Sequence, residues 1–265
     1  EGDARTLAHA AVQAVAELKP QHILAEIGPC GLPLDASSKA SLNENRAQYA
    51  DAARAFQGEP IDALFLNGFT RIDDLKCALM GVRQISNLPL FASVVLGETP
   101  LDPVCSTAQG QTPDEEVLAN IGQSLLVGYE LAELERATGM PANRKGLEAD
   151  RWPEAVSVMA DLGASVVGFE TAEPAFKAVA YAQQAAQITD LPLLAQLRAT
   201  ADQSARQAAP LVPLDDILEY TPDTMAPAAV KLYGAGVQFL RATGKATSSF
   251  TGALAATVFG LDVHK

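Results

Sequence analysis

The sequence predicts an α/β protein built around a parallel β-sheet. Short apolar runs alternate along the chain with longer segments of helical periodicity, which is typical of repeated βα units. The apolar runs are almost continuously hydrophobic, as expected of strands that are covered on both faces. With 265 residues, 48% of them hydrophobic, the chain is long enough to form one domain, 1–265, with a large core.

Six strands and the helices between them can be placed in chain order. The first residues, 1–19, have the pattern of an amphipathic helix, and a last helix follows the polar turn after the sixth strand. The predicted strands are HILAEI (22–27), DALFLN (62–67), LFASVVL (90–96), SVVGFE (165–170), LLAQL (193–197) and VQFLR (237–241). The predicted helices between them are 42–56, 71–85, 153–162, 174–187 and 222–234.

The helix at 222–234 has clear start signals. Thr221 is placed as the N-cap, Pro222 at the first helical position and Asp223 in the first turn. These residue types satisfy or replace the free N–H groups of a helix start, so this boundary is predicted directly from local chemistry.

The interval between the third and fourth strands is far longer than one helical crossover needs. It begins with many turn-forming residues and continues with a helical pattern and a polar stretch. Residues 98–150 are therefore predicted to be an insertion over the strand-end face. The insertion is either a lid over that face or a surface that contacts a partner.

Composition argues against several classes of partner. The formal net charge of −13 repels phosphate backbones and anionic lipid, so neither nucleic acid nor a membrane is expected as a partner. No apolar run reaches the roughly 20 residues of a membrane span, and the first residues do not have a signal-peptide pattern. The three cysteines are widely spaced and form no CxxC motif, which favours a reducing compartment and predicts a cytoplasmic protein.

Polar side chains gather at the predicted carboxyl ends of the strands, where binding sites form in α/β barrels and open sheets. Arg198 and Arg241 could hold a carboxylate or a phosphate, while Glu26 and Glu170 could hold an amine or act as acid and base. The alternative is that Arg198 pairs with Glu170, and Arg241 with Glu26 or with a helix end, in interactions that only connect strand ends. The predicted substrate-binding residues are Glu26, Asn67, Ser93, Glu170, Thr171, Gln196, Arg198, Arg241 and Thr243.

The usual catalytic and cofactor motifs are not found. The three histidines lie in the first helix, at the start of a strand and near the C-terminus, so a Ser-His-Asp or Cys-His arrangement is not expected. No P-loop occurs, and no GxGxxG motif follows a strand. No metal site is predicted, and the catalytic residues remain unknown. The weak alternative is a zinc site formed by Cys30, Cys105 and a carboxylate.

Six strands can close only part of an eight-stranded barrel, and an open doubly wound sheet is the competing architecture. Five segments, in order, resemble motifs of the homocysteine S-methyltransferase family, which includes betaine–homocysteine methyltransferase and the N-terminal module of cobalamin-dependent methionine synthase. The resemblance runs over about 6–257, is interrupted by the insertion, and implies a (β/α)8 TIM-barrel-like fold. The segments are HILAEIGPCGLPL, DALFLNGFTRIDDLKCAL, LPLFASVVL, RWPEAVSVMADLGASVVGFETAEP and YTPDTMAPAAVKLYGAGVQFLRATGKATS.

The sequence also departs from the family at its metal site and at its start. The family binds zinc through one cysteine after the sixth strand and a cysteine pair after the eighth, and the matching positions here are Thr171, Thr243 and Gly244. The family's glutamate after its fourth strand is replaced by Asn67. The family's first two βα units have no counterpart, so the barrel is expected to be incomplete at the N-terminus. Otherwise residues upstream of Glu1 or another chain supply the two missing units, or the N-terminus is rebuilt.

The resemblance implies a methyltransferase-like enzyme of one-carbon metabolism that does not use the family zinc site. Its substrate would be a small amine, thiol or acid, and a corrinoid protein or a folate would carry the methyl group, with no other cofactor expected. One alternative is a non-catalytic binding or assembly subunit derived from the family. A second is a zinc-dependent homocysteine S-methyltransferase whose ligands have moved to the region of Cys30 and Cys105.

Overall fold

The structure, a computed structural model, describes residues 2–100, 143–199 and 220–263. The predicted insertion, 98–150, lies mostly outside these ranges. Its two described ends form the short antiparallel pair of β4 (Glu98–Pro100) and β5 (Asn143–Lys145) and the 3-10 turn η1 (Ala149–Arg151). The roles predicted for the insertion therefore stay predictions.

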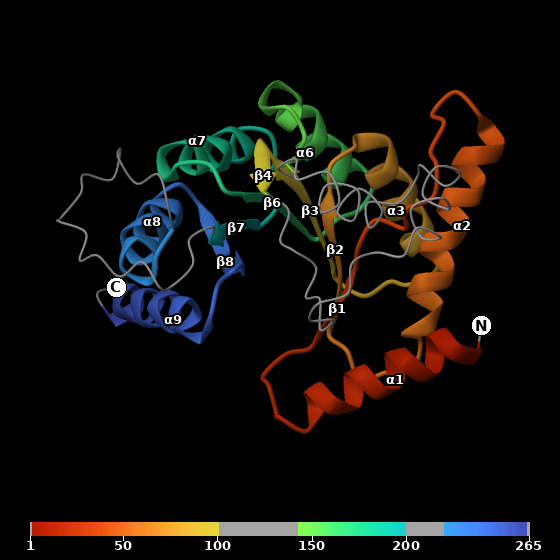
Figure 1. Cartoon of the computed structure of the whole chain (residues 1–265), viewed down its shortest axis with the longest axis horizontal. Helices are drawn as coiled ribbons and strands as arrows, with labels where there is room; N and C mark the ends of the chain where they lie inside the picture. Colours follow the sequence, from red (N-terminus) through yellow and green to blue (C-terminus); the bar gives the residue numbers. More distant parts are fainter. Residues whose placement is uncertain (1, 101–142, 200–219, 264–265) are drawn as a thin grey trace, which may run out of the picture.

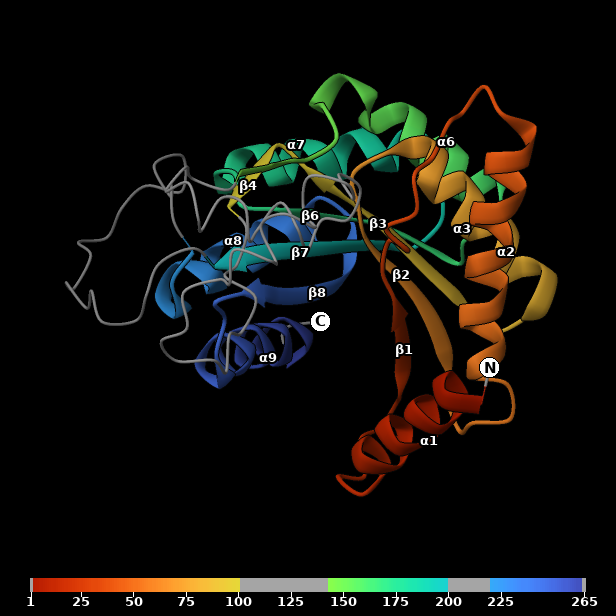
Figure 2. The same cartoon turned by 45° about the vertical axis from the view of Figure 1, so that its right-hand side comes forward.

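Six strands form one sheet in which every neighbouring pair is parallel. The strand order is the chain order, β1-β2-β3-β6-β7-β8, and the sheet curls into part of a barrel (Figures 1 and 2). The predicted parallel α/β fold is thereby confirmed, with strand ends that differ from the prediction by a few residues. The strands are β1 (Leu24–Ile27), β2 (Ala63–Phe69), β3 (Leu90–Leu96), β6 (Val166–Thr171), β7 (Leu193–Ala199) and β8 (Val237–Gly244).

The strand order decides between the two architectures that the sequence left open. A doubly wound sheet reverses its strand order partway, which places helices on both faces. Here the order never reverses, so right-handed crossovers place the helices along one face, the convex one (Figure 1). The helices are α1 (Gly2–Ala16), α2 (Lys39–Ala55), α3 (Ile72–Ile85), α6 (Trp152–Asp161), α7 (Ala175–Ala186), α8 (Pro222–Gly234) and α9 (Ser248–Val263).

Helix α8 begins where its start signals predict. The side chain of Thr221 accepts a hydrogen bond from the backbone N–H of Thr224, and the Thr224 hydroxyl accepts one from the backbone N–H of Thr221 in return.

Within the described ranges, none of the helices combines the length and the apolar character needed to cross a membrane.

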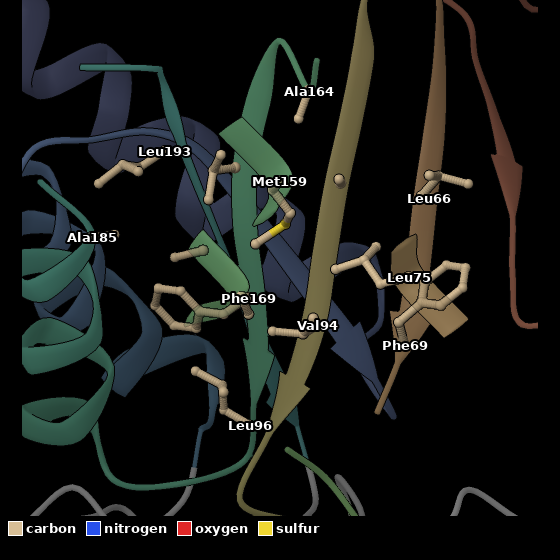
Figure 3. Close-up of a cluster of buried hydrophobic side chains, with 14 of the residues drawn as sticks. Leu66, Phe69, Leu75, Val94, Leu96, Met159, Ala164, Phe169, Ala185 and Leu193 are labelled. Atoms are coloured by element: carbon tan, nitrogen blue, oxygen red, sulfur yellow. The ribbon is translucent and has the colours of Figure 1, made fainter. Parts of the chain in front are cut away.

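The main core lies between the helices and the convex face of the sheet. Figure 3 shows Leu66, Val94 and Phe169 on the strands, facing Leu75 of α3 and Met159 of α6. A second, smaller apolar cluster lies on the other face of the sheet and consists of Phe65, Val166, Leu194 and the partly buried Phe91. Side chains alternate between the two faces of a strand. The strand residues that precede and follow each main-core residue therefore point into the concave face.

Candidate functional site

Strand alternation places a set of polar side chains on the concave face near the carboxyl ends of the strands. Phe65 lies on this face, so Asn67, two positions later on β2, points the same way. The same spacing relates Ser93 to Phe91 on β3. The aromatic and polar residues therefore form successive levels of one concave surface.

Asn67 is the centre of a buried hydrogen-bond network. Its Oδ1 accepts a hydrogen bond from Ser93 Oγ at 2.7 Å and another from Gln196 Nε2 at 2.8 Å. Gln196 Nε2 also donates to Ser93 Oγ at 3.0 Å, and Asn67 Nδ2 donates to Glu26 Oε1 at 2.8 Å. All three uncharged side chains are buried, and each finds partners, as buried polar groups generally do.

The network ends in an ion pair that joins the two edge strands of the sheet. Arg241 Nη1 on β8 lies 2.9 Å from Glu26 Oε2 on β1, and it also donates to Gln196 Oε1 at 3.2 Å. The side chains of Arg241 and Glu26 are 44% and 45% exposed. The guanidinium also lies over the ring of Phe65, with 5.7 Å between its central carbon and the ring centroid. This pair is therefore held in place yet open to solvent.

A second ion pair lies beside the first and is much less accessible. Arg198 Nη1 lies 2.8 Å from Glu170 Oε1, which also accepts a hydrogen bond from Thr243 Oγ1 at 3.0 Å. The side chains of Arg198 and Glu170 are 16% and 6% exposed. Gly244, which follows Thr243 at the end of β8, has a positive φ of 67°. A Cβ at that position would lie 2.7 Å from Arg198 Cγ. The glycine therefore allows Arg198 to cross the end of β8.

The structure brings together all but one of the residues predicted to bind a substrate. Thr171 is the exception, because its hydroxyl donates to the Leu96 carbonyl at 3.3 Å and accepts the Glu173 N–H at 3.1 Å. It follows Glu170 directly on β6, so alternation turns it to the opposite face of the sheet. The ion-pair alternative also describes the geometry correctly, because both predicted Arg–Glu pairs form.

The sequence interpretation missed the aromatic level beneath the polar one. The rings of Phe65 and Phe91 have centroids 6.1 Å apart, and those of Phe91 and Phe239 are 5.0 Å apart. Each aromatic residue lies two positions before a residue of the polar set, namely Asn67, Ser93 and Arg241. Period-two spacing was the signal that could have revealed it.

The residues that the resemblance places at zinc positions do not fit a zinc ion. Thr171 is engaged on the other face, the Thr243 hydroxyl bonds to Glu170, and the clash at Gly244 leaves no room for a ligand side chain. Thiolate, imidazole and carboxylate groups are the usual zinc ligands. In the part of the chain that the structure describes, no group of three or more such residues could hold a metal ion. Cys105, one residue of the alternative zinc site, lies outside the described residues.

Comparison with known proteins relates the chain to others through its fold. No protein-family model and no curated protein sequence matches it. Among solved structures, the apo form of the Escherichia coli homocysteine methyltransferase MmuM is similar with a TM-score of 0.54 and 12% identity, over 97% of this chain and 75% of that chain. The pyruvate carboxylase of Rhizobium etli is similar with a TM-score of 0.46 and 10% identity, over 91% of this chain and 18% of that chain. At 12% identity the likeness to MmuM shows a fold alone, an incomplete TIM-barrel-like α/β fold.

Proposed function

We propose that the chain is a methyltransferase-like protein that binds a small charged ligand at the Glu26–Arg241 pair. The exposure of this pair is the observation that carries the proposal. A ligand can reach Arg241 and Glu26 from solvent, whereas Arg198 and Glu170 are almost enclosed. The buried Asn67 network holds Glu26, and Gln196 holds Arg241, so the two charges are positioned before a ligand arrives.

The ligand class follows from the groups that would exchange partners. A ligand carboxylate would replace Glu26 against the Arg241 guanidinium, and a ligand amine would replace Arg241 against the Glu26 carboxylate. The two Arg–Glu pairs sum to zero charge, so a ligand that carries both groups leaves the site neutral. We therefore propose a small zwitterion within the class of amines, thiols and acids that the sequence suggests.

The proposed reaction is methyl transfer, and its support is the fold shared with the E. coli homocysteine methyltransferase. A corrinoid protein or a folate is proposed as the methyl carrier, approaching the strand-end face. The family's zinc ion has no part in this proposal.

A specific observation favours a second function, a non-catalytic binding or assembly subunit. Both arginines already have carboxylate partners, so the site is complete as a set of ties between strand ends. Such a subunit would bind no small ligand.

Calorimetric titration with homocysteine, glycine betaine, methylamine and acetate tests the ligand site. We expect a zwitterion of this panel to bind, and Arg241→Gln to lower its affinity at least about tenfold, or about 1.4 kcal/mol. Arg151→Gln is the matched control, because Arg151 pairs with Glu154 at the exposed start of α6, a helix that packs against the convex face. No binding by the wild type, or equal binding by Arg241→Gln, would favour the assembly subunit.

Transfer of a methyl group from methylcobalamin or methyltetrahydrofolate to the bound ligand, followed by mass spectrometry, would then separate an enzyme from a binding protein.

A further inference from the structure

A cavity lies between the C-terminal ends of α2 and α3, at the amino ends of β2 and β3. Its volume is about 420 Å³, within the range of roughly 300–1,000 Å³ that is usual for ligand sites. It opens to solvent at Gln57, Gly58 and Asn87, which are exposed. Most of its wall is apolar and is formed by Ala53, Phe56, Ile61, Leu64, Ile85 and Leu88. The cavity therefore has room for an apolar body, at the opposite end of the strands from the candidate site.

The charges around this cavity are negative. Of the described residues that line it, Glu59 alone carries a formal charge, and its side chain is 15% exposed. Helices α2 and α3 both end at the cavity, and the C-terminal end of a helix carries a partial negative charge. The arginines in the last turns of these helices do not line the cavity. Arg54 pairs with Asp51, and Arg83 donates to backbone carbonyls, among them that of Gly163. The electrostatics of the cavity therefore favour a cation over an anion.

An imidazole group from α1 contacts the carboxylate of the cavity. His9 Nδ1 lies 3.1 Å from each carboxylate oxygen of Glu59, and Figures 1 and 2 show α1 beside the end of α2. The His9 side chain is 62% exposed, so this contact faces solvent. A contact of this kind contributes little to stability, because water screens it and competes for both groups. A ligand cation can therefore replace His9 at Glu59 without a large cost to the fold.

We propose that this cavity is a second binding site and that it takes an organic cation, an ammonium group on an apolar body. The ammonium would replace His9 at the Glu59 carboxylate, and the body would lie against the apolar wall between the two helix ends. In α/β barrels the chemistry takes place at the carboxyl ends of the strands, so this site would bind its ligand without transforming it. The inference does not depend on the proposed ligand site at Glu26 and Arg241.

Ligands of the same shape but another charge are poorer occupants. A neutral ligand would gain only the burial of its apolar body and would leave Glu59 no better paired than before. An anionic ligand would place two negative charges in contact beside two helix C-termini. The three classes can therefore be distinguished with probes that differ only in charge.

Calorimetric titration with hexylamine, hexanol and hexanoate tests the proposal. We expect hexylamine to bind at least about tenfold more tightly than hexanol, and hexanoate not to bind. Glu59→Gln should lower the affinity for hexylamine at least about tenfold, because it removes the charge and keeps the shape of the side chain. Glu154→Gln is the matched control and should leave this affinity unchanged, because Glu154 lies on α6 and pairs with Arg151.

A second variant tests the same site without removing Glu59. Asn87→Arg places a positive charge at the mouth of the cavity, so the affinity for hexylamine should again fall at least about tenfold. Circular dichroism of both variants should match that of the wild type, since Asn87 is exposed and Glu59 lies in a loop.

Three outcomes would overturn the proposal. No binding of hexylamine by the wild type, or equal binding of hexylamine and hexanol, would show that the cavity does not select a cation. Binding that neither Glu59→Gln nor Asn87→Arg weakens would show that the amine binds elsewhere. Binding that Glu26→Gln abolishes and Glu59→Gln does not would place the amine on the concave face, which would support the proposed function and contradict this inference.

Discussion

At the scale of single residues, the chemistry of the concave face depends on one amide. Asn67 accepts from Ser93 and Gln196 and donates to Glu26, so its oxygen and nitrogen have opposite tasks. A carboxylate of the same shape could do only the accepting. The network therefore needs an amide at this position, where the resembling family carries glutamate.

The substitution Asn67→Asp tests this assignment. It would place a second carboxylate oxygen about where Nδ2 now lies, 2.8 Å from Glu26 Oε1. Position 67 is buried although Glu26 is partly exposed, and two carboxylates in contact repel each other. We therefore expect the free energy of unfolding to fall by about 2 kcal/mol in denaturant titrations. The exposed control Asn87→Asp should change it by less than about 0.5 kcal/mol.

A double-mutant cycle makes the test specific. Glu26→Gln provides an amide that can donate to the new carboxylate, so the double variant should be more stable than the sum of the single effects by at least about 1 kcal/mol. Strict additivity would mean that the contact between residues 26 and 67 does not carry the effect.

At the scale of elements, α2 and α3 pack against each other beside the loop that follows β1. Gly81 of α3 permits the close approach, because a Cβ there would lie 2.4 Å from the Arg46 carbonyl of α2. Tyr49 of α2 donates its hydroxyl to Asp74 Oδ1 of α3 at 2.7 Å and accepts the Cys30 N–H at 2.9 Å. A single buried hydroxyl therefore connects both helices to the loop after β1.

The charge on Asp74 makes this contact dependent on pH. Burial raises the pKa of Asp74 above its ordinary value of 3.8, and this outweighs the opposite effects of the Tyr49 hydrogen bond and of Arg71. A raised folded-state pKa means that the folded protein holds this proton more tightly than the unfolded chain. The contribution of Asp74 to stability therefore falls as pH rises from about 3.8 through the folded-state pKa.

Asp74→Asn should consequently be more stable than the wild type at neutral pH, because the amide still accepts the Tyr49 hydrogen bond without a buried charge. The difference in thermal midpoint should shrink as the pH falls through the raised folded-state pKa of Asp74, because the wild-type carboxyl then takes up its proton. Asp73→Asn, one residue earlier on the more exposed side of the same helix start, should give no such rise. An Asp74→Asn midpoint below that of the wild type at neutral pH would contradict the assignment.

At the scale of the whole molecule, the sheet has one covered face and one that is partly open. The convex face packs its side chains against the helices, while the aromatic level of the concave face reaches solvent through Phe239, which is 40% exposed on the edge strand β8. A residue of the same type should therefore contribute less to the free energy of unfolding on the concave face than on the convex face.

Two phenylalanines provide the comparison. Phe69 is buried against the helices, and Phe69→Ala should lower the free energy of unfolding of the isolated chain by about 3–5 kcal/mol. Phe239 is 40% exposed, and Phe239→Ala should cost about 1 kcal/mol or less. Similar losses for the two variants in denaturant unfolding would show that the concave face of the isolated chain is covered.

The sequence by itself determined the types and order of the elements and the residues at the strand ends. These depend on local properties, such as the apolar runs of the strands and the N-cap of α8, which act over a few residues. The alternation of apolar runs with helical segments also predicted the parallel sheet correctly.

The tertiary structure alone decided which of those residues meet. The network joins Glu26 to Asn67 across 41 positions, Asn67 to Gln196 across 129, and Glu26 to Arg241 across 215. Such contacts depend on sheet register and curl, which no local pattern specifies. Thr171 is different, because strand alternation alone could have separated it from Glu170 in advance. The Glu26–Arg241 pair lies on the two edge strands and is exposed, whereas Glu170 and Arg198 lie on inner strands and are nearly buried. The place of each strand in the sheet is a property of the whole molecule.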